Sequence, residues 1–166
     1  MATWTPTIDS VSESFRGSIP ASVDIPCVEG NSDVNRLPND IYATALLIAS
    51  RQDGTAVANR NNTASVSEHV LQYSVQFYRD GAFQKACEYK AFMESGVHEY
   101  DGLFDYFRSS DVQRLDTVIS LRFEERAQLT VEIRVVFKLD DAVDSVATSG
   151  INVNVEEIID NIEARN

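Results

Sequence analysis

The side chains of this sequence that could do chemistry are few and widely spaced. Its two histidines are His69 and His98. His98, Glu99 and Asp101 could supply metal ligands, but they lie almost consecutively and lack the recurrent spacing of dedicated metal sites. His69 falls on the apolar side of an alternating segment, where a core histidine is the simpler interpretation. A metal-dependent hydrolase built around His98 is therefore a minor alternative.

A second group of candidates is the run Glu124, Glu125 and Arg126. Neighbouring side chains on a strand point in opposite directions, so the two carboxylates should diverge and not form an acid–base pair. We interpret the run as a solvated turn or as a subunit contact made through Arg126. The sequence also lacks a Gly-rich phosphate loop, a nucleophile elbow and CxxC or HExxH motifs. We therefore predict that the chain is not an enzyme and needs no cofactor.

The composition predicts an acidic globular domain. The chain has 166 residues, 43% of them hydrophobic, and a net charge of −12, which fits one folded domain. That charge argues against a protein that grips the nucleic-acid backbone. No apolar run approaches the ~20 residues that span a membrane, and no secretory signal is apparent. We expect a protein made in a cytoplasm, with Cys27 and Cys87 reduced and Cys87 buried in a helix.

The N-terminal half predicts few regular elements. Ile8, Val11 and Phe15 suit one short helix that ends near Gly17, and three prolines predict an extended course over residues 17–40. Residues 42–50 form an apolar run typical of a buried strand. Residues 51–67 are rich in Asn, Ser and Thr and predict a long polar loop.

The following segments predict the core of the fold. Residues 68–78 alternate as a strand, and residues 82–94 have helical spacing, with Asp80 as N-cap and Gly96 as the stop. A second short helix is expected over 103–107, and strands are expected over 117–123 and 128–138. The fold class is α+β, with a mainly antiparallel sheet of about four to five strands packed with one or two helices. Residues 1–138 would form this single domain.

Residues 139–166 predict an acidic C-terminal arm, because they carry seven acidic residues and one basic residue. Asn154 can cap a short helix with an apolar stripe at positions i, i+3, i+4 and i+7. The stripe consists of Val155, Ile158, Ile159 and Ile162. A helix this short is unstable alone in water, so it must dock either on its own domain or on a neighbour.

Several landmarks occur in a characteristic order along the chain. Pro38-Asn-Asp-Ile-Tyr42 leads into a strand, and a strand ending in Tyr78-Arg-Asp-Gly81-Ala-Phe83 enters a helix. Leu103-Phe-Asp-Tyr-Phe107 and the strand start Phe123-Glu-Glu-Arg126 follow. Over about residues 38–138 this order resembles the neck or tail terminator proteins of long-tailed bacteriophages.

The resemblance implies a structural virion protein. Its members form a ring, commonly a hexamer, that caps the head-proximal end of the tail tube, fixes its length and joins it to the head connector. The implied partners are further copies of the chain, the tail tube protein, a sheath protein where the tail contracts, and a head-completion protein. DNA would pass through the lumen without specific binding, and no membrane would be involved. The protein would assemble in the host cytoplasm.

The candidate contact residues for subunits or partners are Glu124, Glu125, Arg126, Val155, Ile158, Ile159 and Ile162. Two alternatives stay open. One is a tail tube or head-completion subunit. The other is a small acidic regulator that mimics DNA, which the net charge of −12 suggests.

Overall fold

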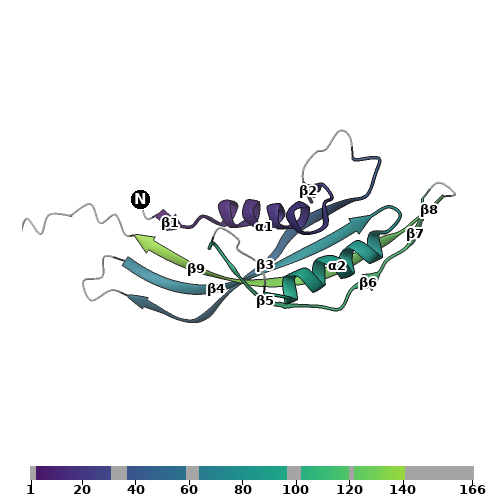
Figure 1. The fold of residues 1–166 in the computed structure, drawn as a ribbon. Helices are drawn as coiled ribbons and strands as arrows, with labels where there is room; N and C mark the ends of the chain where they lie inside the picture. Colours follow the sequence, from purple (N-terminus) through teal and green to yellow (C-terminus); the bar gives the residue numbers. More distant parts are fainter. Residues whose placement is uncertain (1–2, 31–36, 59–63, 97–101, 120–121, 141–166) are drawn as a thin grey trace, which may run out of the picture.

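The α+β fold class predicted from the sequence is confirmed by a computed structural model, which describes residues 3–30, 37–58, 64–96, 102–119 and 122–140 (Figure 1). Two helices and nine strands follow each other along the described part of the chain. They are β1 (Thr3–Thr5), α1 (Ile8–Val23), β2 (Cys27–Glu29), β3 (Tyr42–Ala58), β4 (Ala64–Tyr78), α2 (Ala82–Glu94), β5 (Asp105–Ser109), β6 (Gln113–Arg114), β7 (Thr117–Ile119), β8 (Arg122–Glu124) and β9 (Arg126–Asp140).

The main sheet of the described residues has seven strands, more than the four to five expected. Its order is β1-β9-β4-β3-β2, and β5 and β6 also pair with β9. The pairings are antiparallel except that β2 runs parallel to β3. The additional strands are short and cover parts of the two sheet edges, where side-chain alternation over two to five residues gives little sequence signal.

The prediction of a long polar loop over residues 51–67 is wrong. β3 continues to Ala58 and β4 begins at Ala64, so most of this stretch belongs to a long antiparallel pair. Backbone groups pair whatever the side chain, and β4 offers a regular partner because it is itself paired with β9 without interruption from Ala64 to Tyr78. Irregular register between Asp53 and Val57, with Gly54 at φ 83°, accommodates the polar residues.

Helix α1 is longer than expected. It passes through Gly17 and Pro20 and ends at Val23, whereas the sequence predicted an end near Gly17 and an extended course beyond it. Burial overrides these two weak helix formers, because the apolar residues continue at helical spacing. The buried stripe of α1 consists of Val11, Phe15, Ile19 and Val23. The helix stops at Asp24, which adopts a left-handed conformation with φ 53°.

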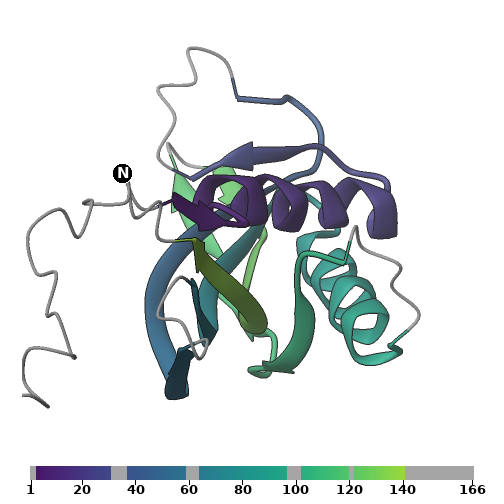
Figure 2. The ribbon, with the colours of Figure 1, turned by 90° about the vertical axis from the view of Figure 1, so that its left-hand side faces the viewer.

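Both helices lie on one face of the main sheet and enclose the core with it (Figure 2). The ring of Phe15 in α1 stacks on Tyr73 in β4 with centroids 4.1 Å apart. The Tyr73 hydroxyl also shares a 2.8 Å hydrogen bond with Ser12, and Ser18 makes one of 3.0 Å with Tyr89 of α2. These buried polar pairs fix α1 relative to the sheet and to α2, because an unpaired hydroxyl in the core would be destabilising.

The segment after α2 also differs from the prediction. The short helix expected over 103–107 is wrong, since Asp105–Ser109 form β5 on the edge of β9 and Phe104 is buried in the core. The single strand expected over 117–123 is instead divided between β7 and β8, which pair with each other in a separate two-stranded sheet. The secondary structure of both segments depends on the strands with which they pair. Local periodicity in the sequence does not reveal those partners.

The bounds of α2 agree with the prediction, but two details do not. The N-cap is Gly81, at φ 86°, and not Asp80. Cys87, expected to be buried, is exposed, and both cysteines are free. Helical spacing places Cys87 off the buried side of α2, which consists of Ala82, Ala86, Tyr89 and Met93.

Some predictions fall on residues outside the described part. These are the helix with Val155, Ile158, Ile159 and Ile162, and the possible ligands His98, Glu99 and Asp101. Among the residues that are described, no helix is long and apolar enough to cross a membrane.

Candidate interface at the α2 end of the sheet

Glu124, Glu125 and Arg126 lie where β8 passes into β9, beside the beginning of α2. Arg126 pairs with Tyr78, the last residue of β4, and so closes the β4–β9 ladder at this end. Tyr78 in turn pairs with Tyr42, the first residue of β3. We call this the α2 end of the sheet and define it by Tyr42, Tyr78 and Arg126.

Glu125 caps helix α2 from a distant part of the chain. Its carboxylate accepts hydrogen bonds from the backbone N–H of Gly81 at 3.0 Å and of Phe83 at 3.1 Å. Arg114 approaches the same carboxylate at 3.3 Å. Gly81 has no side chain with which to cap the helix, so Glu125 satisfies backbone donors that would otherwise lack a protein partner.

The environment of Glu125 favours its ionised form. The two backbone hydrogen bonds from Gly81 and Phe83 lower the pKa of Glu125, with a smaller contribution from Arg114. The positive end of the α2 dipole acts in the same direction. The side chain is only 16% exposed, so a solvated turn does not describe this residue.

Glu124 points away from Glu125 and holds two arginines, as the expected divergence of the two side chains requires. It accepts from Arg126 Nη2 at 2.7 Å and Nε at 3.0 Å, and it lies 3.2 Å from Arg79 Nη1. Its side chain is 11% exposed. The two-pronged contact with Arg126 fixes the orientation of the guanidinium as well as its position.

Aromatic rings form the surface under these arginines. Tyr42 and Tyr78 stack with centroids 4.8 Å apart and an interplanar angle of 9°. Arg126 lies over Tyr78 at 5.2 Å and Arg79 over Tyr42 at 5.9 Å, both within cation–π range. Burial and the neighbouring Tyr78 raise the pKa of Tyr42, so its hydroxyl stays protonated at neutral pH.

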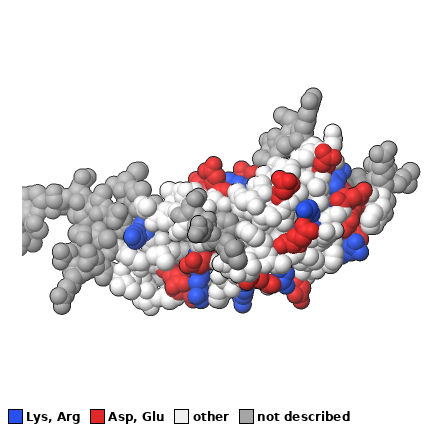
Figure 3. Space-filling view, in the orientation of Figure 1, with Lys and Arg blue, Asp and Glu red and all other residues white. Residues whose placement is uncertain are grey.

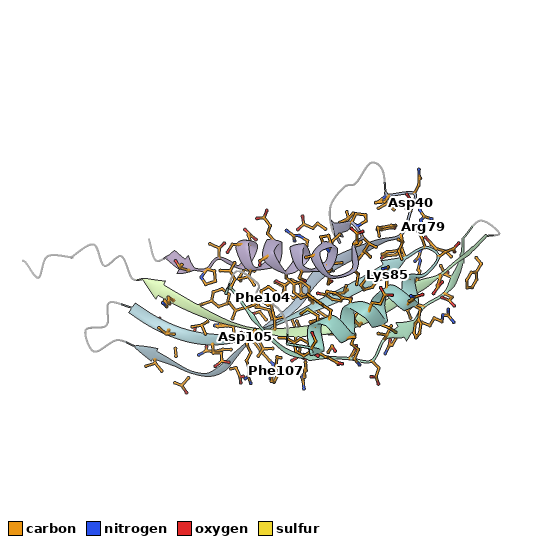
Figure 4. The ribbon with its side chains drawn as sticks, viewed as in Figure 1. Asp40, Arg79, Lys85, Phe104, Asp105 and Phe107 are labelled. Atoms are coloured by element: carbon orange, nitrogen blue, oxygen red, sulfur yellow. The ribbon has the colours of Figure 1, made fainter. Side chains whose placement is uncertain are left out.

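A hollow of about 900 Å³ opens against this cluster. Figure 4 shows Asp40 and Arg79 beside each other on its wall. Two apolar side chains in its lining are exposed, Phe123 by 64% and Leu37 by 50%. The lining residues are Leu37, Asn39, Asp40, Ile41, Tyr42, Arg79, Asp80, Phe123, Glu124 and Arg126. Apolar rings among fixed charges suit the docking of another protein surface.

The carboxylates of Glu124 and Glu125 at the α2 end are engaged by other groups of the protein. Glu124 is held in ion pairs and Glu125 caps α2, and across the described ranges no group of three or more His, Cys, Asp and Glu residues could hold a metal ion. The sequence identified Glu124, Glu125 and Arg126 but not Leu37, Tyr42 and Arg79. Strand register pairs Tyr42 with Tyr78, the residue before Arg79, and Leu37 lines the same hollow from the segment before β3. Phe123 begins the Phe123-Glu-Glu-Arg126 landmark.

A second charged cluster lies on the face of the sheet opposite the helices. Glu132 of β9 accepts from Arg108 at 2.8 Å and from Arg51 at 3.4 Å. The hydrogen bond from Arg108 is the main cause of a lowered pKa of Glu132. Arg134 lies over the Phe107 ring at 4.2 Å. Figure 3 shows basic and acidic side chains interspersed on the visible surface. Charges of both signs are therefore mixed on this surface, and neither sign forms a continuous patch.

Comparison with known proteins assigns the family. A model of the family described as "Phage neck terminator protein" matches residues 9–160, which is most of the chain and includes both helices and the main strands. The chain belongs to this family. The resemblance inferred from the sequence landmarks is thereby confirmed, and it extends beyond residues 38–138 in both directions.

Among solved structures, this neck terminator family member is similar to the sheath/tube terminator of an extracellular contractile injection system, PVC, determined by cryo-electron microscopy in the extended state. The TM-score is 0.46 and the sequence identity 11%, over 80% of this chain and 57% of that one. The chain thus spans little more than half the length of that protein. No curated protein sequence matches the chain.

Proposed function

We propose that this neck terminator is a structural subunit that forms a ring, with six copies as the expected number, at the head-proximal end of the phage tail tube. The ring ends tube elongation and joins the tail to the head connector, and no catalytic step is involved. The family match over residues 9–160 is the observation that carries this proposal. Assembly would take place in the host cytoplasm before the protein enters the virion.

The α2 end supplies one contact surface in this proposal. Glu124 and Glu125 hold Arg79, Arg126 and the start of α2 in place, so the hollow has a fixed wall. The exposed rim residues Phe123 and Leu37 would then contact a neighbouring subunit or the tube. Pre-organised side chains lose little conformational entropy on binding, which favours a specific interface.

The C-terminal arm, residues 139–166, supplies the second contact surface beyond the domain of residues 1–138. Its apolar stripe of Val155, Ile158, Ile159 and Ile162 would dock on a neighbouring virion protein. Partners would be further copies, the tail tube protein, a sheath protein if the tail contracts, and the head-completion protein. The net charge of −12 would keep DNA from adhering as it passes the ring.

Native mass spectrometry of the purified protein, with negative-stain images of tails, tests the ring. We expect a closed oligomer of one size and a single ring per tail, seen at its head-proximal end. A protein that stays monomeric and is absent from purified virions would refute the proposal. Copies distributed along the whole tube would instead indicate a tube subunit.

Substitution tests the arm separately. We expect Ile158→Asp with Ile162→Asp to abolish ring closure or tail joining while the thermal unfolding of the domain is unchanged. Asn161→Asp with Ala164→Asp is the matched control, because it adds the same charge off the apolar stripe. If the first pair unfolds the protein, the arm packs on its own domain. If both pairs act alike, charge and not the stripe is responsible.

A further inference from the structure

The outer edge of β3 is largely unpaired in the described structure. β2 covers only Ala43–Ala45, and Gly30 adds one bond to the carbonyl of Ala45. β3 continues to Ala58 with β4 on its inner side, and over residues 47–58 no described strand lies on the outer side. A long row of unpaired N–H and C=O groups is a template for one more strand, and proteins normally cover or block it.

The distal part of this edge contains one register irregularity, between Asp53 and Val57, but lacks the proline and charged side chains that usually block an edge. Residues 54–58 contain neither proline nor a charged side chain. Val57 is 70% exposed and pairs with Val66, which is also exposed. Exposed Val136 of β9 lies on the same face, since it pairs with Glu68, two residues from Val66. An added strand with apolar side chains on this face would extend the row.

We propose that residues 151–154 of the same chain add to this edge as a strand antiparallel to β3, beside residues 54–58. Residues 151–155 read Ile-Asn-Val-Asn-Val, which alternates apolar and amide side chains with the period of a strand. No charged residue occurs from 145 to 155, so the segment matches the uncharged edge. Ile151 and Val153 would lie on the side of Val57.

The position of the chain after β9 permits this pairing. β9 ends at Asp140, opposite Ala64 of β4, at the end of the sheet where β3 reaches Ala58 (Figure 1). Three strand spacings of about 4.8 Å separate β9 from a strand added outside β3, roughly 14 Å in all. Residues 141–150 can span up to about 33 Å. Because β3 runs parallel to β9, a returning chain runs antiparallel to β3.

The added strand is compatible with the arm helix expected from the sequence. An N-cap residue has extended backbone dihedral angles, so Asn154 can end the strand and begin the helix at Val155. Pairing of residues 151–154 within the chain would leave the apolar stripe of the helix available to a partner. The proposal therefore stands whether or not the protein forms a ring.

Disulfide cross-linking tests the pairing in the full chain with Cys27→Ala and Cys87→Ser. Val57→Cys is combined with Ile151→Cys or with Val153→Cys, and the matched control combines it with Asn152→Cys, which lies on the other face. We expect at least one same-face pair to cross-link about tenfold faster than the control, since a disulfide needs closely apposed Cβ atoms. The product should run as a monomer on a non-reducing gel, with the cross-link confirmed by peptide mass spectrometry.

Equal rates for all three pairs would overturn the proposal. A cross-linked dimer would overturn it too, because the strand would then come from a second copy. Hydrogen exchange gives an independent measure. In the full chain, Asn152→Pro with Val153→Pro removes one N–H on each side of the added strand and should speed exchange in residues 54–58 by about tenfold, whereas Asp144→Pro should not. Unchanged exchange in the double variant would refute the added strand.

Discussion

The two ends of the main sheet are built in different ways. At the α2 end, Tyr42, Tyr78 and Arg126 close the strands, and residues from four separate segments are tied together by ion pairs, stacked rings and a capped helix. At the other end, which we call the tip and define by Val57, Val66 and Val136, strands extend beyond the helices and these apolar side chains are exposed (Figure 1). The first end is fixed by side chains and the second by backbone pairing.

This difference separates two kinds of contact surface. Ion pairs held on aromatic rings orient side chains before a partner arrives, so the α2 end suits recognition of a defined surface. A free backbone edge recognises any extended chain of suitable side-chain pattern. In the function that we propose, the α2 end would contact a specific partner and the tip would receive the strand that we propose from the chain itself.

The core between the two ends should give the largest effect. Phe15→Ala removes a fully buried ring stacked on Tyr73 and should lower the free energy of unfolding by about 3–5 kcal/mol. Chemical denaturation followed by circular dichroism measures this loss. A single transition is expected, because α1 and the sheet share this core. Two separated transitions would show that the two ends of the sheet unfold independently. The control is Ser22→Ala, at the half-buried end of α1, which should lower the free energy of unfolding far less than Phe15→Ala.

At the α2 end, Glu125→Ala should lower the free energy of unfolding by about 1–2 kcal/mol, because the cap on α2 is lost. Hydrogen exchange should rise first in the N-terminal turn of α2, around Gly81 and Phe83. Glu88→Ala, on the exposed side of the same helix, is the control and should change little. Equal losses for both variants would mean that Glu125 does not act as the cap.

The fold could be predicted from the sequence where periodicity is long and regular. α2 and the strand of residues 128–138 were recognised with nearly their observed bounds, because their apolar spacing persists over three or more turns or alternations. Residues 51–58 and 105–109 were missed because β4 and β9 supply their pairing partners, and composition carries no sign of a partner.

The candidate interface could also be predicted only in part, because its contacts join distant parts of the sequence. The sequence shows a charged run at Glu124, Glu125 and Arg126. It does not show that Glu125 caps α2, because the two groups are more than forty residues apart in sequence. Gly81 could have hinted at it, since a glycine N-cap leaves a helix without a side-chain acceptor of its own. The continuation of α1 through Pro20 has no local signal beyond the repeat of buried apolar residues.

The cap should also depend on pH. Backbone hydrogen bonds lower the pKa of folded Glu125 below its ordinary 4.5. The stabilisation is therefore fully present above pH 4.5 and is lost as the pH falls through the lower folded value. Comparing Glu125→Gln with the unaltered chain across pH 7 to 3 should show a stability difference that shrinks on acidification. A difference that grows on acidification would contradict the lowered pKa.

The smallest effect should come from Val136 at the tip, which forms a matched pair with its neighbour in β9, Val135. Val135 is buried in the core and Val136, on the opposite face, is half exposed. Val135→Thr buries a hydroxyl and should lower the free energy of unfolding by about 1–2 kcal/mol. Val136→Thr should change it by less than about 0.5 kcal/mol, because its side chain already contacts water. Both values come from the same denaturation experiment, and a loss at Val136 as large as that at Val135 would mean that this face of the tip is covered in solution.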